Sequence, residues 1–331
     1  MSKVLITGCA GLLGANFSRY LLDAGYDVVG IDDLSGGFAD SVPSGVVFYE
    51  ANLSNAEKVN YIFNTEKPDF VYHFAAYAAE GLSPFIRNYN YTNNVLCSAN
   101  IINACVNNDV EKVIFTSSMA VYGEGNPPFT ESQLPCPEDP YGIAKYAVEM
   151  DLKLAYEMFG LNYNIVRPHN VVGIYQNIWD RYRNVIGIWI RKILNNEPVT
   201  IFGDGTQVRA FSDIKFYMEP FEKLMSPRFN GETFNIGADK DFTINEAADL
   251  LIEVASEFGY NAEKVHLEKR NEVHTAYCDH TKAQEFLGFS DDTDLKSTMR
   301  KMFSWALEQP NREVKNMDYE IEKNMYSFWK K

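Results

Sequence analysis

Short apolar runs alternate with longer helical patterns through the first half of the chain, and this alternation restricts the fold more than any other feature. The runs are apolar throughout, which is typical of parallel strands that helices cover on both faces. We expect strands at 4–7, 28–31, 46–49, 70–74, 113–116 and 164–167, with helices near 12–24, 55–65, 85–108 and 140–159. The sequence therefore predicts an α/β fold built on a doubly wound parallel sheet.

After about residue 170 this rhythm ends. We expect a helix at 178–195, a loop at 202–207, and further helices near 213–225, 244–258, 280–287 and 294–307. A chain of 331 residues suits two interlocked domains. We place the first at 1–170, around the sheet. The second, at 171–331, is a smaller mixed α/β lobe that binds the substrate, with some segments crossing back to the sheet.

The tail at 311–331 carries apolar residues at helical spacing, namely Met317, Ile321, Met325 and Phe328. This pattern predicts an amphipathic helix docked on the protein's own body. A helix that binds a partner is the alternative.

A glycine-rich turn joins the first expected strand to the first expected helix. Gly8, Gly11 and Gly14 permit a tight turn, close approach of the backbone to a pyrophosphate, and close packing of helix on strand. Asp32 follows the second strand, 18 residues after Gly14, near the spacing of about 20 expected for the acid that bonds an adenosine ribose. Because a carboxylate suits a free 2′-hydroxyl, we expect NAD rather than NADP.

Charge and cysteine content exclude several other classes of protein. The net charge of −15 argues against a nucleic acid or an anionic membrane as partner. The five cysteines are scattered and lack metal-ligand spacing, which indicates a reducing compartment and no metal site. The chain opens on a strand rather than a signal peptide, and no apolar run is long enough for a membrane span. We expect a cytoplasmic protein.

Tyr141 and Lys145 lie four residues apart on an expected helix, and therefore on one face of it. An ammonium beside a phenol favours the phenolate, so we expect Lys145 to lower the pKa of Tyr141. Ser118 follows the run 113–115 and should lie at the carboxyl end of a strand, where open parallel sheets bind ligands. Such a Tyr–Lys pair alone is common on helix surfaces. His73 ends the fourth strand, and we expect it to be a hydrogen-bonded core residue.

These features resemble the extended short-chain dehydrogenase/reductase superfamily, and within it the NAD-dependent nucleotide-sugar epimerases and dehydratases. The resemblance covers nearly the whole chain. It rests on Thr7-Gly8-x-x-Gly11-x-x-Gly14, Asp32, His73-Phe74-Ala75-Ala76, Asn93-Asn94-Val95, Thr116-Ser117-Ser118-x-x-Val121-Tyr122-Gly123, Pro140-Tyr141-x-x-x-Lys145, Arg167-Pro168-x-Asn170-Val171-x-Gly173, Gly203-Asp204-Gly205-x-Gln207-x-Arg209 and Phe234-Asn235-Ile236-Gly237. It implies a Rossmann-type sheet with a smaller substrate-binding lobe.

The resemblance also implies where ligands bind. NAD would lie along Gly8, Gly11, Leu12, Leu13, Gly14, Asp32, Asp33, Ser35, Gly36, Asn52, Leu53, Phe74, Ala75, Ala76, Asn93, Tyr141, Lys145 and Pro168. Ser118 and Tyr141 would bracket the 4-hydroxyl of a hexose. Its nucleotide diphosphate would contact Asn170, Arg209 and Arg270, and Glu272 would hold the nucleotide ribose. The helices near 85–108 and 140–159 would form a homodimer.

The residues after Ser118 separate the chemistries of this superfamily. Relatives that are 4,6-dehydratases usually carry an Asp-Glu pair where this chain has Met119-Ala120, and decarboxylases usually keep a glutamate there. The resemblance therefore favours 4-epimerisation of a UDP-hexose. Alternatives are another NAD-dependent nucleotide-sugar modifier, such as a 4,6-dehydratase, and a non-catalytic NAD-binding regulator.

The sugar is indicated by the residue that limits space at C2. Alignment on Asp279 places Ala276 there, whereas a slip of one residue would place Tyr277 there. Because a small side chain leaves room for an acetamido group, we favour UDP-N-acetylglucosamine, with UDP-glucose as the second substrate.

Overall fold

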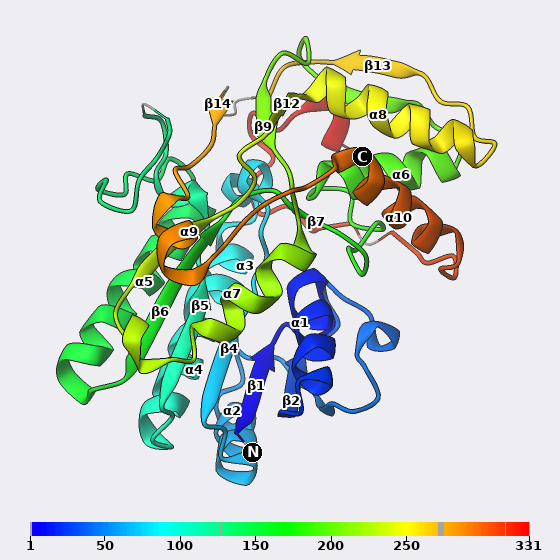
Figure 1. Cartoon of the computed structure of the whole chain (residues 1–331). Coiled ribbons are helices and arrows are strands. Elements are labelled where there is room, and N and C mark those ends of the chain that lie inside the picture. Colours follow the sequence, from blue (N-terminus) through cyan, green and yellow to red (C-terminus); the bar gives the residue numbers. More distant parts are fainter. Residues whose placement is uncertain (1, 126, 271–274, 315, 331) are drawn as a thin grey trace.

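The computed structural model describes residues 2–125, 127–270, 275–314 and 316–330. Its first half alternates strands and helices as the sequence predicts (Figure 1). The strands are β1 (Lys3–Thr7), β2 (Asp27–Asp32), β3 (Val47–Glu50), β4 (Phe70–His73), β5 (Lys112–Thr116) and β6 (Asn162–Pro168). The helices are α1 (Leu12–Asp23), α2 (Ala56–Glu66), α3 (Arg87–Tyr91), α4 (Cys97–Asn107) and α5 (Pro140–Phe159), with a π-helical turn at Thr92–Leu96 between α3 and α4.

Seven strands form one parallel sheet in the order β11-β6-β5-β4-β1-β2-β3, where β11 is Thr233–Ile236. Every neighbouring pair in it is parallel. The strand order reverses between β1 and β4, and open sheets of this kind bind ligands at such a point. The prediction of a doubly wound α/β fold is confirmed. The chain after residue 170 returns to the sheet through β11.

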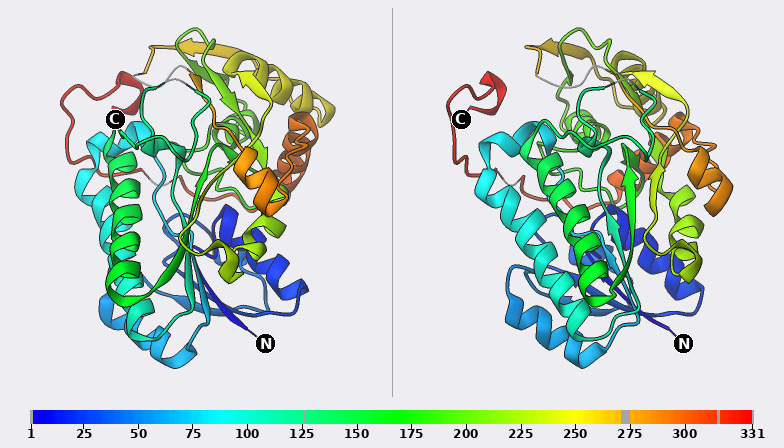
Figure 2. Two further views of the ribbon diagram at one scale, coloured as in Figure 1. Left: turned by 60° about the vertical axis from the view of Figure 1, so that its left-hand side comes forward. Right: turned by 90° about the vertical axis from the view of Figure 1, so that its left-hand side faces the viewer.

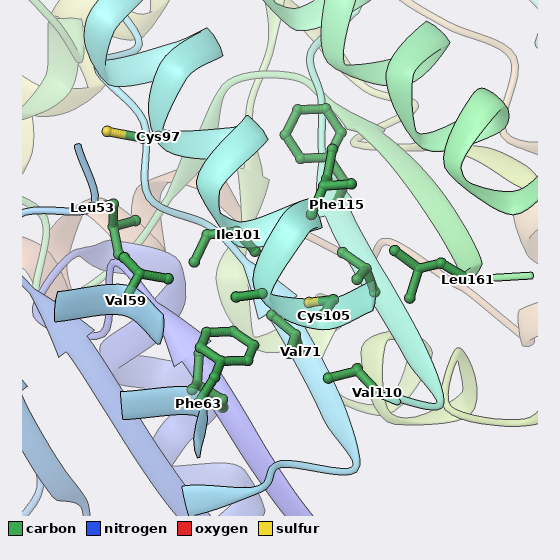
Figure 3. Packing of buried hydrophobic residues seen from close by; sticks show 14 of the residues in the cluster. Leu53, Val59, Phe63, Val71, Cys97, Ile101, Cys105, Val110, Phe115 and Leu161 are labelled. Atoms are coloured by element: carbon green, nitrogen blue, oxygen red, sulfur yellow. The ribbon is translucent and has the colours of Figure 1, made fainter. Parts of the chain in front are cut away.

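Apolar side chains hold helices against both faces of the sheet. On one face, Phe63 of α2 and Ile101 of α4 pack against Val71 and Phe115 of the strands (Figure 3). On the other face, the cluster includes side chains from α1, α7 (Met218–Lys223) and α9 (Thr281–Leu287). Full burial of a side chain of this size stabilises the fold by roughly 1.5–3 kcal/mol. The sheet is therefore a rigid platform for whatever binds at its carboxyl edge.

The remaining part of the second half has a core of its own. Helices α6 (Val185–Leu194), α8 (Ile244–Glu257) and α10 (Leu295–Leu307) enclose this core together with small sheets. Those sheets pair β8 (Val199–Phe202) with β13 (Lys264–Leu267), β9 (Val208–Ala210) with β12 (Asp241–Thr243) and β14 (Thr275–Ala276), and β7 (Val171–Val172) with β10 (Ser212–Asp213). Figure 1 shows this lobe above the carboxyl ends of the large sheet.

The helix predicted at 178–195 is wrong in its first part, since α6 begins only at Val185. Side-chain hydrogen bonds replace helical ones before it. The Asn177 side chain accepts from the N–H groups of Trp179 and Asp180, and Asp180 accepts from the N–H of Tyr182. Asn184 then has a φ of +72°, which no helix continues through.

The tail does not form the amphipathic helix that its spacing predicts. Its only helical turn among the described residues is a 3-10 turn at Ser327–Trp329. It nevertheless docks on the protein's own body, because Met325 and Trp329 are buried in a cluster with Phe85 and Tyr182. Tail contacts with distant segments, rather than local helical bonds, decide its conformation. None of the helices that the structure describes is long and apolar enough to span a membrane.

Candidate active site

A cavity of about 740 Å³ opens at the carboxyl ends of the parallel strands, between the sheet and the second lobe. Residues that follow β1, β2, β4 and β5 line one side, and the first turn of α5 closes it. Residues from 168–211 and Arg270 line the other side. The cavity lies at the reversal of strand order, where the sheet topology predicts a ligand.

The glycine turn after β1 has no space for side chains. Gly8 has a φ of +72°, and a Cβ there would lie 2.8 Å from the N atom of Ala75. A Cβ on Gly14 would overlap the carbonyl of Gly8, so this glycine brings α1 close to the turn. The twelve-residue helix α1 begins without a side-chain cap and without an acid in its first turn. Its open N–H groups therefore suit a phosphate.

The carboxylate of Asp32 is positioned by the backbone. One oxygen accepts from the N–H of Ala10 at 3.0 Å and the other from that of Leu34 at 2.8 Å. Burial raises the pKa of Asp32. Asp33 accepts from the Asn52 side chain at 2.9 Å, which joins the ends of two neighbouring strands. The predicted residues Gly8, Gly11, Leu12, Leu13, Asp32, Asp33, Ser35, Gly36, Asn52, Leu53, Phe74, Ala75, Ala76, Asn93 and Pro168 all line the cavity, whereas Gly14 lies behind the turn.

Tyr141 enters the cavity because α5 begins beside it. Asp139 caps this helix by accepting from the N–H groups of Tyr141 and Gly142, and Pro140 occupies the first turn. One turn later, the buried Lys145 donates from Nζ to the carbonyl of Thr116 at 2.7 Å. The lysine therefore ties α5 to the end of β5, and both Tyr141 and Lys145 line the cavity.

Ser118 lies between β5 and a 3-10 turn at Met119–Val121. Its hydroxyl accepts from the N–H of Ala120 at 3.1 Å, and a hydrogen bond with Tyr141 is one of the influences on the phenol. The structure thus brings Ser118, Tyr141 and Lys145 to one wall of the cavity.

Burial, rather than the charge of Lys145, has the largest effect on the pKa of Tyr141. Burial raises the pKa of Tyr141 well above its usual range, and the charge of Glu80 raises it further, while the hydrogen bond with Ser118 lowers it. Burial also lowers the pKa of Lys145 to about 7, although Glu149 opposes this shift. The lysine Nζ lies 5.9 Å from the centre of the tyrosine ring. Burial therefore disfavours both charged forms.

His73 is a hydrogen-bonded core residue, as predicted. Its Nδ1 lies 2.7 Å from the Thr7 hydroxyl and its Nε2 lies 2.8 Å from the Ser98 hydroxyl. The side chain is 1% exposed and links β4 to β1 and α4 beneath the cavity.

The predicted substrate residues come from scattered segments. Asn170, Arg209 and Arg270 line the cavity, and Asn170 has a φ of +41°. The guanidinium of Arg270 lies 4.1 Å from the centre of the Phe202 ring. The backbone of Ala276 pairs with that of Arg209 through β14 and β9. Glu272 lies outside the described residues.

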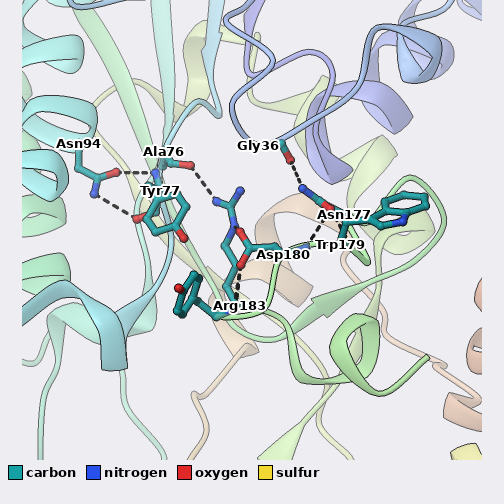
Figure 4. Close-up of polar contacts among 9 residues, drawn as sticks. Gly36, Ala76, Tyr77, Asn94, Asn177, Trp179, Asp180 and Arg183 are labelled. Carbon is teal, nitrogen blue, oxygen red and sulfur yellow. Dashed lines mark hydrogen bonds and ion pairs between the residues drawn. The ribbon is translucent and has the colours of Figure 1, made fainter. Parts of the chain in front are cut away.

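Arg183 is a cavity residue that the sequence analysis missed. Its Nε forms an ion pair with Asp180 at 2.7 Å, and its Nη1 donates to the carbonyl of Ala76 at 3.4 Å (Figure 4). The guanidinium also lies 4.4 Å from the ring centre of Tyr77, and any Cβ on Gly36 would meet it. It thus spans the ends of β2 and β4, across the glycine turn of β1. No motif marks Arg183, because its position depends on the irregular segment before α6.

A glycine turn without space for side chains, a buried acid after β2 and a Tyr–Lys pair on α5 together define a dinucleotide-dependent enzyme of the extended short-chain dehydrogenase/reductase type. Residues 4–237 match the model of the NAD dependent epimerase/dehydratase family. The chain belongs to this family, whose cofactor is NAD, and the geometry of the turn and of Asp32 suits that cofactor.

Similar proteins include several UDP-sugar 4-epimerases. A putative UDP-glucose 4-epimerase of Methanocaldococcus jannaschii is 33% identical over 91% of this chain and 97% of its own. A UDP-glucose 4-epimerase of Thermotoga maritima, solved with UDP-glucose, is 31% identical, with a TM-score of 0.85 over 92% of this chain and 99% of its own. A UDP-N-acetylglucosamine 4-epimerase of Methanobrevibacter ruminantium, solved with UDP-N-acetylmuramic acid, is 30% identical, with a TM-score of 0.84 over 93% of this chain and 99% of its own.

Proposed function

We propose that this protein catalyses NAD-dependent 4-epimerisation of a UDP-hexose through a transient 4-keto sugar. The observation that carries the proposal is the wall formed by Ser118, Tyr141 and Lys145 in one cavity with the dinucleotide turn. Met119 and Ala120, which follow Ser118, provide no acid or base. The similarity to UDP-sugar 4-epimerases supports the same reaction.

Each residue of this wall has a separate role: Tyr141 and Ser118 move one proton, and Lys145 positions the groups around them. NAD, when bound, supplies the hydride acceptor and a positive ring that favours the phenolate. Tyr141 takes the proton of the 4-hydroxyl and later returns it. Ser118, whose contact with the phenol lowers the pKa of Tyr141, holds the same oxygen and relays its proton. Lys145 would hold the nicotinamide ribose, and its bond to the carbonyl of Thr116 ties it to the end of β5.

Epimerisation requires that the 4-keto sugar presents its other face for reduction. We infer that the nucleotide is held firmly while the hexose is held loosely. Arg209 and Arg270 would contact the diphosphate by charge-assisted hydrogen bonds, together with Asn170. Binding energy from this remote, non-reacting part then positions C4 without fixing the ring.

We infer that UDP-N-acetylglucosamine is a substrate beside UDP-glucose, because Ala276 corresponds to the residue that limits space at C2 in the resembling epimerases. The similarity to a UDP-N-acetylglucosamine 4-epimerase supports this preference.

A 4,6-dehydratase is the second candidate, and one residue favours it. Glu80 lines the same cavity, and its charge raises the pKa of Tyr141, so a carboxylate faces the proposed site from outside the usual acid positions. A dehydratase would release water and yield a 4-keto-6-deoxy sugar, whereas an epimerase conserves mass.

The deciding experiment incubates the purified protein, without added NAD, with UDP-glucose or UDP-N-acetylglucosamine. We expect the C4 epimer at equilibrium, with unchanged mass. A product lighter by one water would favour the dehydratase. An NAD-loaded protein that converts neither sugar nucleotide would overturn both the epimerase and the dehydratase assignments. The remaining hypothesis would then be a non-catalytic NAD-binding regulator.

We infer that two copies pair through the helices near 85–108 and α5. The observation that supports pairing is a row of exposed apolar residues on α5, with Met150 at 48%, Leu154 at 53% and Met158 at 70% exposure. Light scattering on the purified protein should give twice the chain mass, and Leu154→Glu should give the single mass.

A further inference from the structure

The C-terminal segment, residues 316–330, touches both sides of the cleft. Asn316 accepts from Arg181 of the second lobe at 2.7 Å. Glu320 then crosses to the first domain, where its carboxylate accepts from the N–H groups of Asn88 and Tyr89 at 2.7 and 2.9 Å. Its own N–H donates to the carbonyl of Phe85 at 2.8 Å. In the left view of Figure 2 this red segment passes outside the cyan helices.

Buried aromatic contacts hold the segment in place. Trp329 is 4% exposed, and its ring centre lies 5.9 Å from that of Phe85 and 5.6 Å from that of Tyr182. Phe85 belongs to a 3-10 turn of the first domain, Glu80–Phe85, and Tyr182 precedes α6. The indole therefore fills a gap between the two sides of the cleft, and Met325 adds to the same cluster.

The segment also reaches the cavity itself. Tyr326 lines the cavity together with Phe202 and Arg270. The ring of Phe328 lies 4.4 Å from that of Phe202, over which the Arg270 guanidinium lies at 4.1 Å. A chain of contacts thus runs from the segment to a cation of the cavity. Aromatic rings beside a guanidinium suit a nucleoside diphosphate, because the rings offer flat apolar surface and the cation offers charge.

The compared relatives align over a smaller share of this chain than of their own chains. Their alignments cover 97 to 99% of their own chains but only 91 to 93% of this one. Some residues of this chain therefore lie outside those alignments.

We propose that the C-terminal segment completes the substrate pocket as the wall that contacts the UDP part of the substrate. Tyr326 faces the nucleotide, and Phe328 holds Phe202 and, through it, Arg270. This inference rests on the proposed function for the identity of the nucleotide. Contacts to the UDP part are equal in the ground and transition states, so their loss raises KM while kcat stays nearly unchanged.

The test measures UDP binding to the NAD-loaded, full-length protein by titration calorimetry. Tyr326→Ala and Phe328→Ala should each weaken UDP binding about fivefold, since an aromatic contact contributes less than a tenfold change in affinity. A chain that ends at Val314 should lose more than either variant. Ile321→Ala is the matched control, because its side chain is 42% exposed and its backbone N–H donates to the carbonyl of Phe85.

The readouts separate a pocket wall from a general structural role. Bound NAD and the thermal midpoint should stay near wild type in both point variants, and Phe328→Tyr should restore UDP affinity. If the truncated chain does not fold, the point variants decide. UDP affinity within twofold of wild type in both, or weaker binding accompanied by loss of NAD, would overturn the inference.

Failure of the proposed function gives a different result. A wild-type protein that binds UDP but epimerises no UDP-sugar would overturn the epimerase and still allow the variants to be compared. In an active enzyme, a fall in kcat at unchanged KM in these variants would also contradict the proposal that the segment forms a wall of the substrate pocket.

Discussion

The two sides of the cleft are built in different ways. On the cofactor side, several candidate residues stand within two residues of a strand's carboxyl end: Gly8 after β1, Asp32 in β2, Phe74 after β4 and Ser118 after β5. On the substrate side, Asn170 follows β6, but Arg183, Arg209 and Arg270 come from segments that share no sheet.

This difference explains why local sequence patterns can predict the residues of the cofactor side but not those of the substrate side. Parallel strands align their carboxyl ends at one edge, so residues that follow successive strands meet whatever the loops do. The other side depends on side-chain hydrogen bonds such as those of Asn177 and Asp180, which place Arg183 beside Gly36 (Figure 4). Substitutions on the two sides should therefore affect different properties: chemistry on one and ligand retention on the other.

The largest expected effect is that of Tyr141→Phe. Because the phenol moves the proton, kcat for epimerisation should fall by about 10²–10⁴-fold, while bound NAD stays stoichiometric. Initial rates with each UDP-sugar and the NAD absorbance of the purified protein measure the two quantities. Tyr146→Phe, on the same helix but outside the cavity, is the control. A loss of less than tenfold would remove Tyr141 from the proposed chemistry.

Arg183→Ala tests a residue on the substrate side of the cleft by measuring how tightly the protein binds NAD. If the guanidinium neutralises the cofactor diphosphate, NAD binding should weaken by about 10–100-fold, as expected for a charge-assisted pair. Rates at saturating NAD should change little. Arg181→Ala, two residues earlier and directed to Asn316, should keep its NAD. If both variants retain equal amounts of NAD after gel filtration, Arg183 does not bind the cofactor diphosphate.

Ala276→Tyr tests the preferred sugar and should have a smaller effect. A bulky ring at this position should lower kcat/KM for UDP-N-acetylglucosamine about tenfold or more, because a filled pocket excludes the acetamido group. The value for UDP-glucose should stay within threefold. Parallel losses with both sugars would show that residue 276 does not limit the space at C2.

The smallest expected effect is on the free energy of unfolding, and buried histidines on both sides of the cleft contribute to it. Burial lowers the pKa of His73 to about 3, from an ordinary value of 6.5, with a further contribution from Lys145. Between these values the unfolded chain binds more protons, so the free energy of unfolding falls as pH decreases from 6.5 towards 3. The slope should reach about 1.4 kcal/mol per pH unit.

Urea unfolding of wild type and His73→Gln at pH 7 and pH 5 measures this slope. The variant should lose part of the pH dependence and keep the remainder, because burial also lowers the pKa of His169, on the substrate side, to about 3. An unchanged pH dependence would mean that His73 is already protonated in the fold or that its neighbours compensate.

The tail shows the limit of local patterns. Met317, Ile321, Met325 and Phe328 have helical spacing, yet Ile321 is 42% exposed and Met325 is buried. The spacing predicts a stripe facing one neighbour, whereas the segment contacts α3 on one side and Phe202 on the other. Contacts with these two surfaces, rather than helical hydrogen bonds, set the conformation of the segment, so its side-chain period misleads.

The sequence by itself determined the sheet, its glycine turn, the acid after β2, and the Tyr–Lys pair, because each depends on contacts within one β-α unit. Only the tertiary structure decided what stands opposite them: Arg183 across the turn, Glu80 near the phenol, and Tyr326 in the cavity wall. It also decided that Tyr141 is buried, which raises the pKa of its phenol. These properties arise from packing between segments far apart in the chain, and no local pattern records such packing.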